Sequence, residues 1–161
     1  MLLDETILKK YPHELSGGML QRIFIANALL LDPDVLLLDE PTMALDPPLK
    51  KEMIQLFRSL SEEGMAILFI SHELSLVREL TDRVLVLYKG FVVEEGKTAD
   101  VFQRPEHPYT KGLLSSSPDL VTFRNLRYMK MPDQETNGSH CPFFSRCTQR
   151  SNRCLNEPIP I

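Results

Sequence analysis

The sequence predicts an α/β fold in which parallel strands are flanked by helices. Residues 35–38 and 65–70 are wholly apolar, and residues 48–64 between them have the spacing of an amphipathic helix. Wholly apolar strands are typical of parallel sheets that are buried on both faces. A strand, a helix and a strand in this order form a β-α-β unit, and functional residues are expected at the carboxyl ends of its strands.

Apolar spacing and turn residues predict the other elements along the chain. Residues 16–31 carry apolar side chains three and four positions apart, with Ser16 as the N-cap and Asp32-Pro33 as the end of a helix. The helix over residues 48–64 ends at Gly64. Beyond it the sequence predicts a short helix within residues 71–80, a β-hairpin of residues 83–88 and 91–95, and a short helix from about Thr98.

The composition changes near residue 105. The residues that follow are rich in proline, serine and asparagine and carry scattered apolar side chains, so the sequence predicts irregular structure there. We therefore expect two parts, residues 1–104 with the sheet and residues 105–161 as a C-terminal extension.

Composition and charge exclude several classes of function. The chain has 161 residues, of which 43% are hydrophobic and 25% charged, as in a compact soluble domain. A net charge of −4 with scattered basic residues offers no patch that would attract nucleic acid, so no nucleic-acid partner is expected. The apolar runs are far shorter than the ~20 residues that cross a bilayer, and the first residues lack a signal peptide's layout, so we expect a cytosolic chain.

The segment "HELSGGMLQR" places a serine and two glycines directly before a predicted helix. A helix N-terminus presents unpaired N–H groups, and glycines let an anion approach the backbone closely. Ser16, Gly17 and Gly18 therefore suit a phosphate group. Taken in isolation, a capping serine followed by a glycine turn explains the same residues.

Polar residues also follow the two predicted strands. Asp39 and Glu40 follow the first, in "LLLDEPT", where one carboxylate can hold Mg²⁺ through water and the other can orient an attacking water in phosphoryl transfer. His72 follows the second, in "ISHE", from where it could reach a γ-phosphate oxygen. Each feature alone is common at solvated strand ends, but "LSGG", "LLLDEPT", "ALD" and "ISH" do not arise in this order by chance.

These four elements resemble those of ATP-binding cassette (ABC) ATPases. "LSGGM" resembles the signature motif of that family, "VLLLDEPT" its Walker B strand, "ALD" its D-loop and "ISH" its switch-histidine loop. The surrounding sequence is most similar to the ATP-binding subunits of bacterial dipeptide/oligopeptide and nickel importers, and "HPYTKGLL" at residues 107–114 resembles their C-terminal extension. The resemblance runs from about Leu8 to the end of the chain and implies an incomplete P-loop NTPase domain of the ABC type.

The resemblance also implies ATP and Mg²⁺ as cofactors and a head-to-tail pair of ATPase subunits. Each ATP lies between the phosphate loop of one subunit and the signature of the other, so the Ser16–Gly18 segment would hold the partner's nucleotide. The implied nucleotide-binding residues are Ser16, Gly17, Gly18, Gln21, Asp39 and Asp46, and the implied catalytic residues are Glu40 and His72. Leu20 departs from the usual arginine or glutamine, which puts surface contacts of the signature helix in doubt.

In that family each residue has a stated role. Asp39 would support Mg²⁺, Glu40 would polarise the attacking water, His72 would contact the γ-phosphate and Asp46 would signal across the dimer interface. The implied partners are transmembrane permease subunits and, indirectly, an extracytoplasmic solute-binding protein. The implied location is the cytoplasmic side of the plasma membrane, as a peripheral subunit.

A complete cassette also needs a phosphate loop, G-x-x-x-x-G-K-[ST], which precedes the signature in this family. The nearest match, "GFVVEEGKT" at residues 90–98, has one residue too many between its glycines and lies in the predicted hairpin. We interpret it as turn glycines and a helix start. The sequence thus resembles the C-terminal part of a cassette, and we expect the chain alone to bind ATP poorly, to hydrolyse none at a meaningful rate, to expose apolar sheet faces and to aggregate.

Three cysteines, Cys141, Cys147 and Cys154, lie in the C-terminal tail with the spacing C-x5-C-x6-C. Their thiolates could bind Zn²⁺ or an iron–sulfur cluster, with His140 or an outside ligand as the fourth donor. Similar tails of peptide-importer ATPases resemble a [4Fe–4S] site. Three thiols packed without metal are the alternative, and the spacing does not decide between them.

The favoured function is an ATP-binding subunit, or a fragment of one, that powers import of peptides or a similar small solute. One alternative is a non-catalytic remnant that binds metal or docks a membrane subunit. Another is a soluble ABC ATPase that acts on nucleic acid or ribosomes, which the acidic charge and "HPYTKGLL" disfavour.

Overall fold

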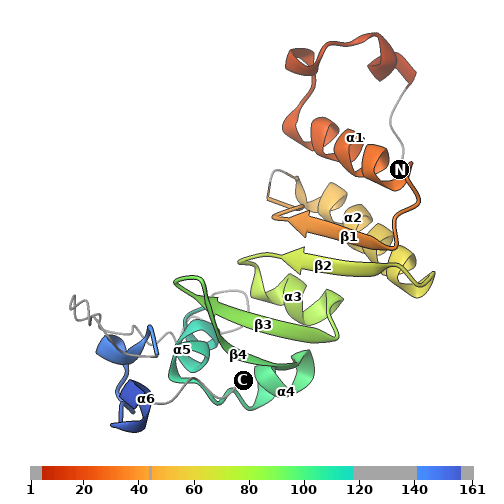
Figure 1. Ribbon diagram of the computed structural model, residues 1–161. Coiled ribbons are helices and arrows are strands. Elements are labelled where there is room, and N and C mark those ends of the chain that lie inside the picture. Colours follow the sequence, from red (N-terminus) through yellow and green to blue (C-terminus); the bar gives the residue numbers. More distant parts are fainter. Residues whose placement is uncertain (1–4, 44, 118–140, 157–161) are drawn as a thin grey trace. The chain divides into compact units, whose positions relative to one another are not determined.

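The computed structural model describes residues 5–43, 45–117 and 141–156, and the chain divides into two compact units, Met1–His72 and Glu73–Ile161 (Figure 1). The first unit contains η1 (Glu5–Lys9), η2 (Pro12–Glu14), α1 (Gly17–Leu29), β1 (Val35–Asp39), α2 (Pro47–Glu62) and β2 (Ala66–Ile70). The second contains α3 (Leu74–Leu80), β3 (Arg83–Tyr88), β4 (Phe91–Lys97), α4 (Thr98–Gln103), α5 (Pro108–Ser116), η4 (Phe144–Arg146) and α6 (Arg153–Asn156). The division between residues 1–104 and 105–161 concerns parts of the sequence and stays a prediction.

The first unit is built on the parallel pair of β1 and β2. Val35 lies opposite Ala66, and Asp39 lies opposite Ile70, so the two strands end at the same level. The connection between them contains α2, which begins where the side chain of Asp46 accepts the N–H of Leu49 at 3.0 Å. The predicted β-α-β unit is confirmed.

One face of this sheet pair is packed. Leu36 and Leu38 of β1 are buried, as are Met53 and Phe57 of α2. The ring of Phe57 meets that of Phe69 edge to face, with 6.3 Å between the ring centroids. Aromatic and aliphatic side chains from the strands and the helix therefore form the core of the first unit.

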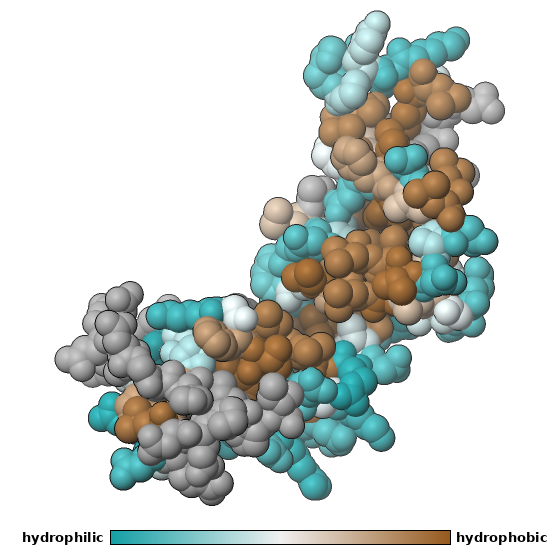
Figure 2. All heavy atoms as spheres, in the orientation of Figure 1, coloured by the Kyte–Doolittle hydropathy of each residue, from teal (hydrophilic) through white to brown (hydrophobic). Residues whose placement is uncertain are grey.

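The opposite face of the pair is exposed. Val35 and Leu37 keep 61% and 62% of their residue surface accessible, and Leu68 and Ile70 on β2 are also exposed. Figure 2 shows apolar side chains gathered at the surface of the first unit. The expectation that apolar sheet faces are exposed is confirmed for the described residues. The burial on both faces that is typical of such strands is not reached there, because a helix covers only one face of the pair.

The second unit begins with α3 and the antiparallel hairpin of β3 and β4. Lys89 and Gly90 make the turn with positive φ values of 50° and 83°, a conformation that glycine adopts without strain. The second glycine of "GFVVEEGKT", Gly96, lies within β4, and Thr98 begins α4. The interpretation is confirmed for Gly90 as a turn glycine and for the helix start, but it is wrong for Gly96, which pairs with Val84 inside the hairpin.

The C-terminal part is more ordered than its composition predicts. Residues 108–116 form α5, where irregular structure was predicted, because His107 caps the helix and Pro108 fits its first turn. Phe143 is fully buried in a core with Val86, Tyr88, Val93 and Val101. Residues before and after position 105 therefore share one hydrophobic core.

None of the helices in the described ranges combines the length and apolarity needed to cross a membrane.

The two faces of the β1–β2 pair should respond differently to truncation of an apolar side chain. We expect Phe57→Ala to lower the free energy of unfolding by about 3–5 kcal/mol, because it leaves a cavity in the packed face. Leu37→Ala, on the exposed face, should change it by about 0.5 kcal/mol or less. Urea denaturation followed by circular dichroism measures both, and equal losses in the two variants would contradict the one-sided core.

Candidate functional site

The carboxyl ends of β1 and β2 bring the predicted strand-end residues together. Asp39 is the last residue of β1, and the N–H of Glu40 donates to the carbonyl of Ile70 at 3.0 Å. Glu40 has a φ of 46°, in the left-handed region that residues with side chains seldom adopt. The chain therefore turns sharply after Asp39 and presents the side chain of Glu40 at the strand ends.

The carboxylate of Glu40 is held by the segment that follows β2. Its Oε1 accepts the backbone N–H of His72 at 3.0 Å and lies 2.7 Å from ring Nδ1 of His72. Its Oε2 accepts the hydroxyl of Ser71 at 3.4 Å. An ionised carboxylate only accepts hydrogen bonds, so Nδ1 of His72 carries a proton. Glu40 and His72, which the sequence places directly after the two predicted strands, are therefore in contact at the ends of β1 and β2.

This pair is accessible to solvent on one side. The side chain of His72 is 69% exposed and that of Glu40 is 27% exposed. The carboxylate is thus fixed by three donors on the protein side but is not sealed from water. Such an arrangement fixes the direction of the carboxylate oxygens and leaves them accessible to water.

The helix α1 reaches the same place through Gln21. Its Nε2 lies 3.5 Å from the carbonyl oxygen of Glu40, the long limit of a hydrogen bond. Its Oε1 is buried and has no hydrogen-bond partner within the described residues. Gln21 therefore links the helix that follows "LSGG" to the end of β1.

Two predicted site residues act as helix caps. The Oγ of Ser16 accepts the N–H of Met19 at 3.3 Å at the start of α1, which places Gly17 and Gly18 in the first turn. Asp46 caps α2. In the structure Ser16 and Asp46 thus stabilise the starts of two helices. The roles in nucleotide binding that the resemblance implies for them stay predictions.

Sequence reasoning did not single out Ser71. The signal was present, because Ser71 precedes His72 directly after the strand and so begins the segment that meets Glu40. Its pairing with Glu40 depends on the parallel register of β1 and β2. Only the structure shows that register residue by residue.

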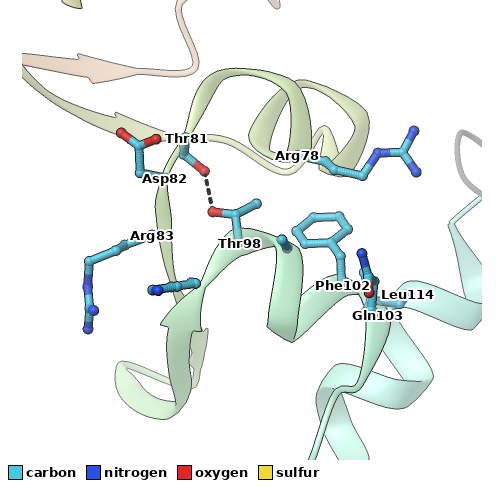
Figure 3. A pocket seen from close by; sticks show the side chains of 10 residues that line it. Arg78, Thr81, Asp82, Arg83, Thr98, Phe102, Gln103 and Leu114 are labelled. Atoms are coloured by element: carbon cyan, nitrogen blue, oxygen red, sulfur yellow. Dashed lines mark hydrogen bonds between the residues drawn. The ribbon is translucent and has the colours of Figure 1, made fainter.

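The second unit has an open pocket with a volume of about 820 Å³ (Figure 3). Thr81 and Thr98 face one another at its wall, with 2.9 Å between their hydroxyl oxygens. Arg83 at its rim is paired with Glu95, with 2.6 Å between Nη2 and Oε1. None of the predicted site residues lines this pocket.

The three cysteines gather against the core of the second unit. Cys141 belongs to that core, and Cys147 and Cys154 are half-buried against it. None of these three cysteines is in a disulfide. Burial raises the pKa of Cys141, and a backbone hydrogen bond from Phe143 partly opposes this.

No group of three or more His, Cys, Asp or Glu side chains in the described ranges is arranged to hold a metal ion. His140, considered as a fourth ligand, lies outside the described residues. Metal binding by the three cysteines therefore stays a proposal.

The sequence matches two protein families in different segments. Residues 1–43 match the ABC transporter family, and residues 93–154 match the family "Oligopeptide/dipeptide transporter, C-terminal region". The dipeptide transport ATP-binding protein DppD of Bacillus subtilis is 41% identical over 155 residues, which are 91% of this chain and 45% of that protein. The glutathione import ATP-binding protein GsiA of Escherichia coli K12 is 47% identical over 125 residues, 77% of this chain and 20% of that protein.

A solved structure shares the fold. The ATP-binding cassette MJ0796, in a dimeric post-hydrolysis state bound to ADP and Pi, is 35% identical with a TM-score of 0.56; the match covers 60% of this chain and 41% of that one. The chain spans less than half the length of the curated relatives it matches. With these matches, the chain belongs to the ATP-binding subunits of the oligopeptide/dipeptide branch of ABC transporters, and what it matches in them is the C-terminal part.

Proposed function

We propose that the chain serves in an ATP-binding subunit that powers ABC-type import of peptides or a similar small solute. The observation that carries the proposal is the Glu40 carboxylate, which is held at the ends of two parallel strands by His72 and Ser71. Open α/β sheets bind ligands at this edge. The names of the relatives, dipeptide transport and glutathione import, indicate small peptides as the class of solute.

Glu40 is the residue that would act on water. Phosphoryl transfer needs little covalent help from the protein beyond a group that orients the attacking water and groups that stabilise charge. The backbone N–H and ring of His72 fix Oε1 of Glu40, while the side chain keeps access to solvent. A carboxylate oriented in this way can accept a hydrogen bond from the water and later its proton.

His72 would supply positive charge to a phosphate oxygen through the ring nitrogen that does not contact Glu40. Its Nδ1 donates to Glu40, so in the neutral ring Nε2 can only accept a hydrogen bond. A phosphate oxygen is also an acceptor, and the ring must therefore be protonated to contact both. Glu40 and His72 accordingly work as a pair.

The donor set at the strand ends fits ATP and Mg²⁺. Asp39, the last residue of β1, offers a carboxylate oxygen of the kind Mg²⁺ prefers, directly or through water. When bound, ATP supplies the phosphoryl group and Mg²⁺ neutralises charge on its oxygens. The buried Oε1 of Gln21, which has no partner among the described residues, adds a polar atom beside Glu40 that can accept a hydrogen bond from ligated water.

The Ser16–Gly18 segment and Asp46 would face a second ATPase subunit. Gly17 and Gly18 form the first turn of α1, where N–H groups are free of helical partners and suit a phosphate. The dimeric state of the cassette MJ0796 supports a pair of subunits as the working assembly. Transmembrane permease subunits, and through them a solute-binding protein, would complete the transporter, with this subunit peripheral on the cytoplasmic side.

A second candidate function concerns metal binding by the cysteine tail. The sulfur of Cys147 accepts the N–H of Gln149 at 3.3 Å, and the Ser151 hydroxyl lies 3.6 Å from the sulfur of Cys154. Both cysteines pack against the core that contains Cys141, and cysteine sulfur is the ligand of zinc and of iron–sulfur clusters. We propose that Cys141, Cys147 and Cys154 ligate Zn²⁺ or an iron–sulfur cluster, with one ligand from elsewhere.

Substitution of Glu40 tests the main proposal. In a chimera in which this chain replaces the matching part of the Bacillus subtilis dipeptide relative, Glu40→Gln should lower kcat for ATP hydrolysis about 10²- to 10⁴-fold. The amide keeps the size of the side chain, so nucleotide binding should persist. Phosphate release and equilibrium binding of ATP measure the two effects.

The matched control for Glu40 is Glu52→Gln, an exposed glutamate of α2. It removes the same charge away from the strand ends and should leave kcat unchanged. Turnover within a few-fold of wild type in Glu40→Gln would show that this carboxylate does not act in hydrolysis.

Metal analysis tests the cysteine tail. The chain purified without oxygen should contain iron or zinc, and replacement of all three cysteines by serine should remove it, since serine does not replace a thiolate ligand. Inductively coupled plasma mass spectrometry measures the content. Ser145→Ala, within the same segment, is the control, and equal metal content in all three proteins would rule the site out.

A further inference from the structure

The pocket of the second unit is built by α3, α4 and α5 together with the start of β3 and the end of β4. Its volume of about 820 Å³ lies in the range of small-molecule sites. In Figure 3, Arg78 lies on the same side of the Thr81–Thr98 pair as Phe102 and Leu114. This side of the pocket therefore combines a cation with apolar surface.

The charges of the lining leave one cation over. The charged lining residues are Arg78, Asp82, Arg83 and Lys97. Arg83 is paired with Glu95, and the charges of Asp82 and Lys97 cancel in the sum. Within the described part of the chain, the guanidinium of Arg78 has no hydrogen-bond or ion-pair partner. Since a guanidinium binds a carboxylate through two parallel hydrogen bonds, Arg78 suits a ligand with one such group.

The wall beside Arg78 is apolar. Phe102 comes from α4 and Leu114 from α5, and both are half-buried, so each keeps surface that a ligand can cover. Aromatic rings bury a large area and pair favourably with a second ring, either offset or edge to face. The ligand group next to the carboxylate should therefore be apolar, and an aromatic side chain suits it well.

The two threonine hydroxyls can only accept a further hydrogen bond. The hydroxyl of Thr81 donates to the carbonyl of Val77 at 2.7 Å. A hydroxyl has one hydrogen, so across the 2.9 Å between the two hydroxyl oxygens Thr98 donates to Thr81. Neither hydroxyl keeps a hydrogen for a ligand. The pair therefore disfavours an anionic group and suits a ligand N–H.

We propose that this pocket binds the C-terminal residue of a short peptide. The carboxylate meets the guanidinium of Arg78, an apolar side chain contacts Phe102 and Leu114, and the N–H of the last peptide group donates to the Thr81–Thr98 pair. The remainder of the peptide extends into solvent, because the pocket is open. The inference goes beyond the import function proposed above and does not rest on it, since none of the residues predicted for nucleotide binding lines this pocket.

A series of three probes tests the three contacts on the full chain, by titration followed with ¹H–¹⁵N NMR. Alanyl-phenylalanine should bind with a Kd on the order of 0.1 mM, as small ligands do. Its C-terminal amide lacks the charge and should bind about 10-fold more weakly. 3-Phenylpropionate keeps the ring and the carboxylate but lacks the peptide N–H, so it should bind about 3- to 10-fold more weakly.

Two variants assign the binding to this pocket. Arg78→Gln removes the cation and should weaken alanyl-phenylalanine binding about 10-fold, while the affinity for the amide should stay the same. Arg78 is exposed, so the Tm of the variant should match wild type. Arg104→Gln is the matched control, because Arg104 is an exposed arginine of the same unit that does not line this pocket. It should leave both affinities unchanged.

The proposal is supported if the peptide shifts the amide signals of Thr81, Thr98 and Phe102 and the affinities follow the expected order. Equal affinity for the peptide and its amide, or equal affinity of wild type and Arg78→Gln, overturns the carboxylate contact. Equal affinity for 3-phenylpropionate overturns the assignment to a peptide and leaves a site for simple aryl carboxylates. No saturable shift at millimolar peptide overturns the site itself. These readouts are independent of ATP hydrolysis, so a failure of the Glu40 test leaves them unchanged.

Discussion

The parallel pairing of β1 with β2 is the constraint on which the candidate site depends. Because Asp39 lies opposite Ile70, the residues that follow the two strands meet without any further element between them. The carboxylate of Glu40 then finds its donors in the next two residues after β2, Ser71 and His72. A shift of one residue in this register would turn each side chain to the other face and separate the pair.

Much of this arrangement could be predicted from the sequence. Apolar runs that end in polar residues indicate parallel strands, and parallel strands place their carboxyl ends at one edge, so Glu40 and His72 could be placed together. The exposure of apolar sheet surface was expected, but which side chains of each strand are buried could not be predicted in the same way. The sequence of a wholly apolar strand is the same whether helices cover one face of its sheet or both. Leu37 is exposed although its neighbours Leu36 and Leu38 are buried.

The C-terminal segment was harder to predict because its order comes from contacts distant in sequence. Phe143 stands in a short segment that shows no helical or strand periodicity, yet it is fully buried against Tyr88 and Tyr109, with ring centroids 5.2 and 5.5 Å apart. Arg146 lies over the ring of Tyr88 and donates to its hydroxyl at 2.9 Å. A few aromatic anchors thus order a segment whose average composition is typical of loops.

The left-handed backbone of Glu40 has a consequence for how such a chain can change over generations. Its φ of 46° costs a residue with a side chain roughly 1–2 kcal/mol, a cost that glycine would not bear. The substitution that best relaxes this turn is therefore one that removes the carboxylate. Glycine at position 40 would raise stability, whereas glutamate is needed for activity. In a protein that no longer needs to hydrolyse ATP, replacement of Glu40 would therefore be favoured by stability.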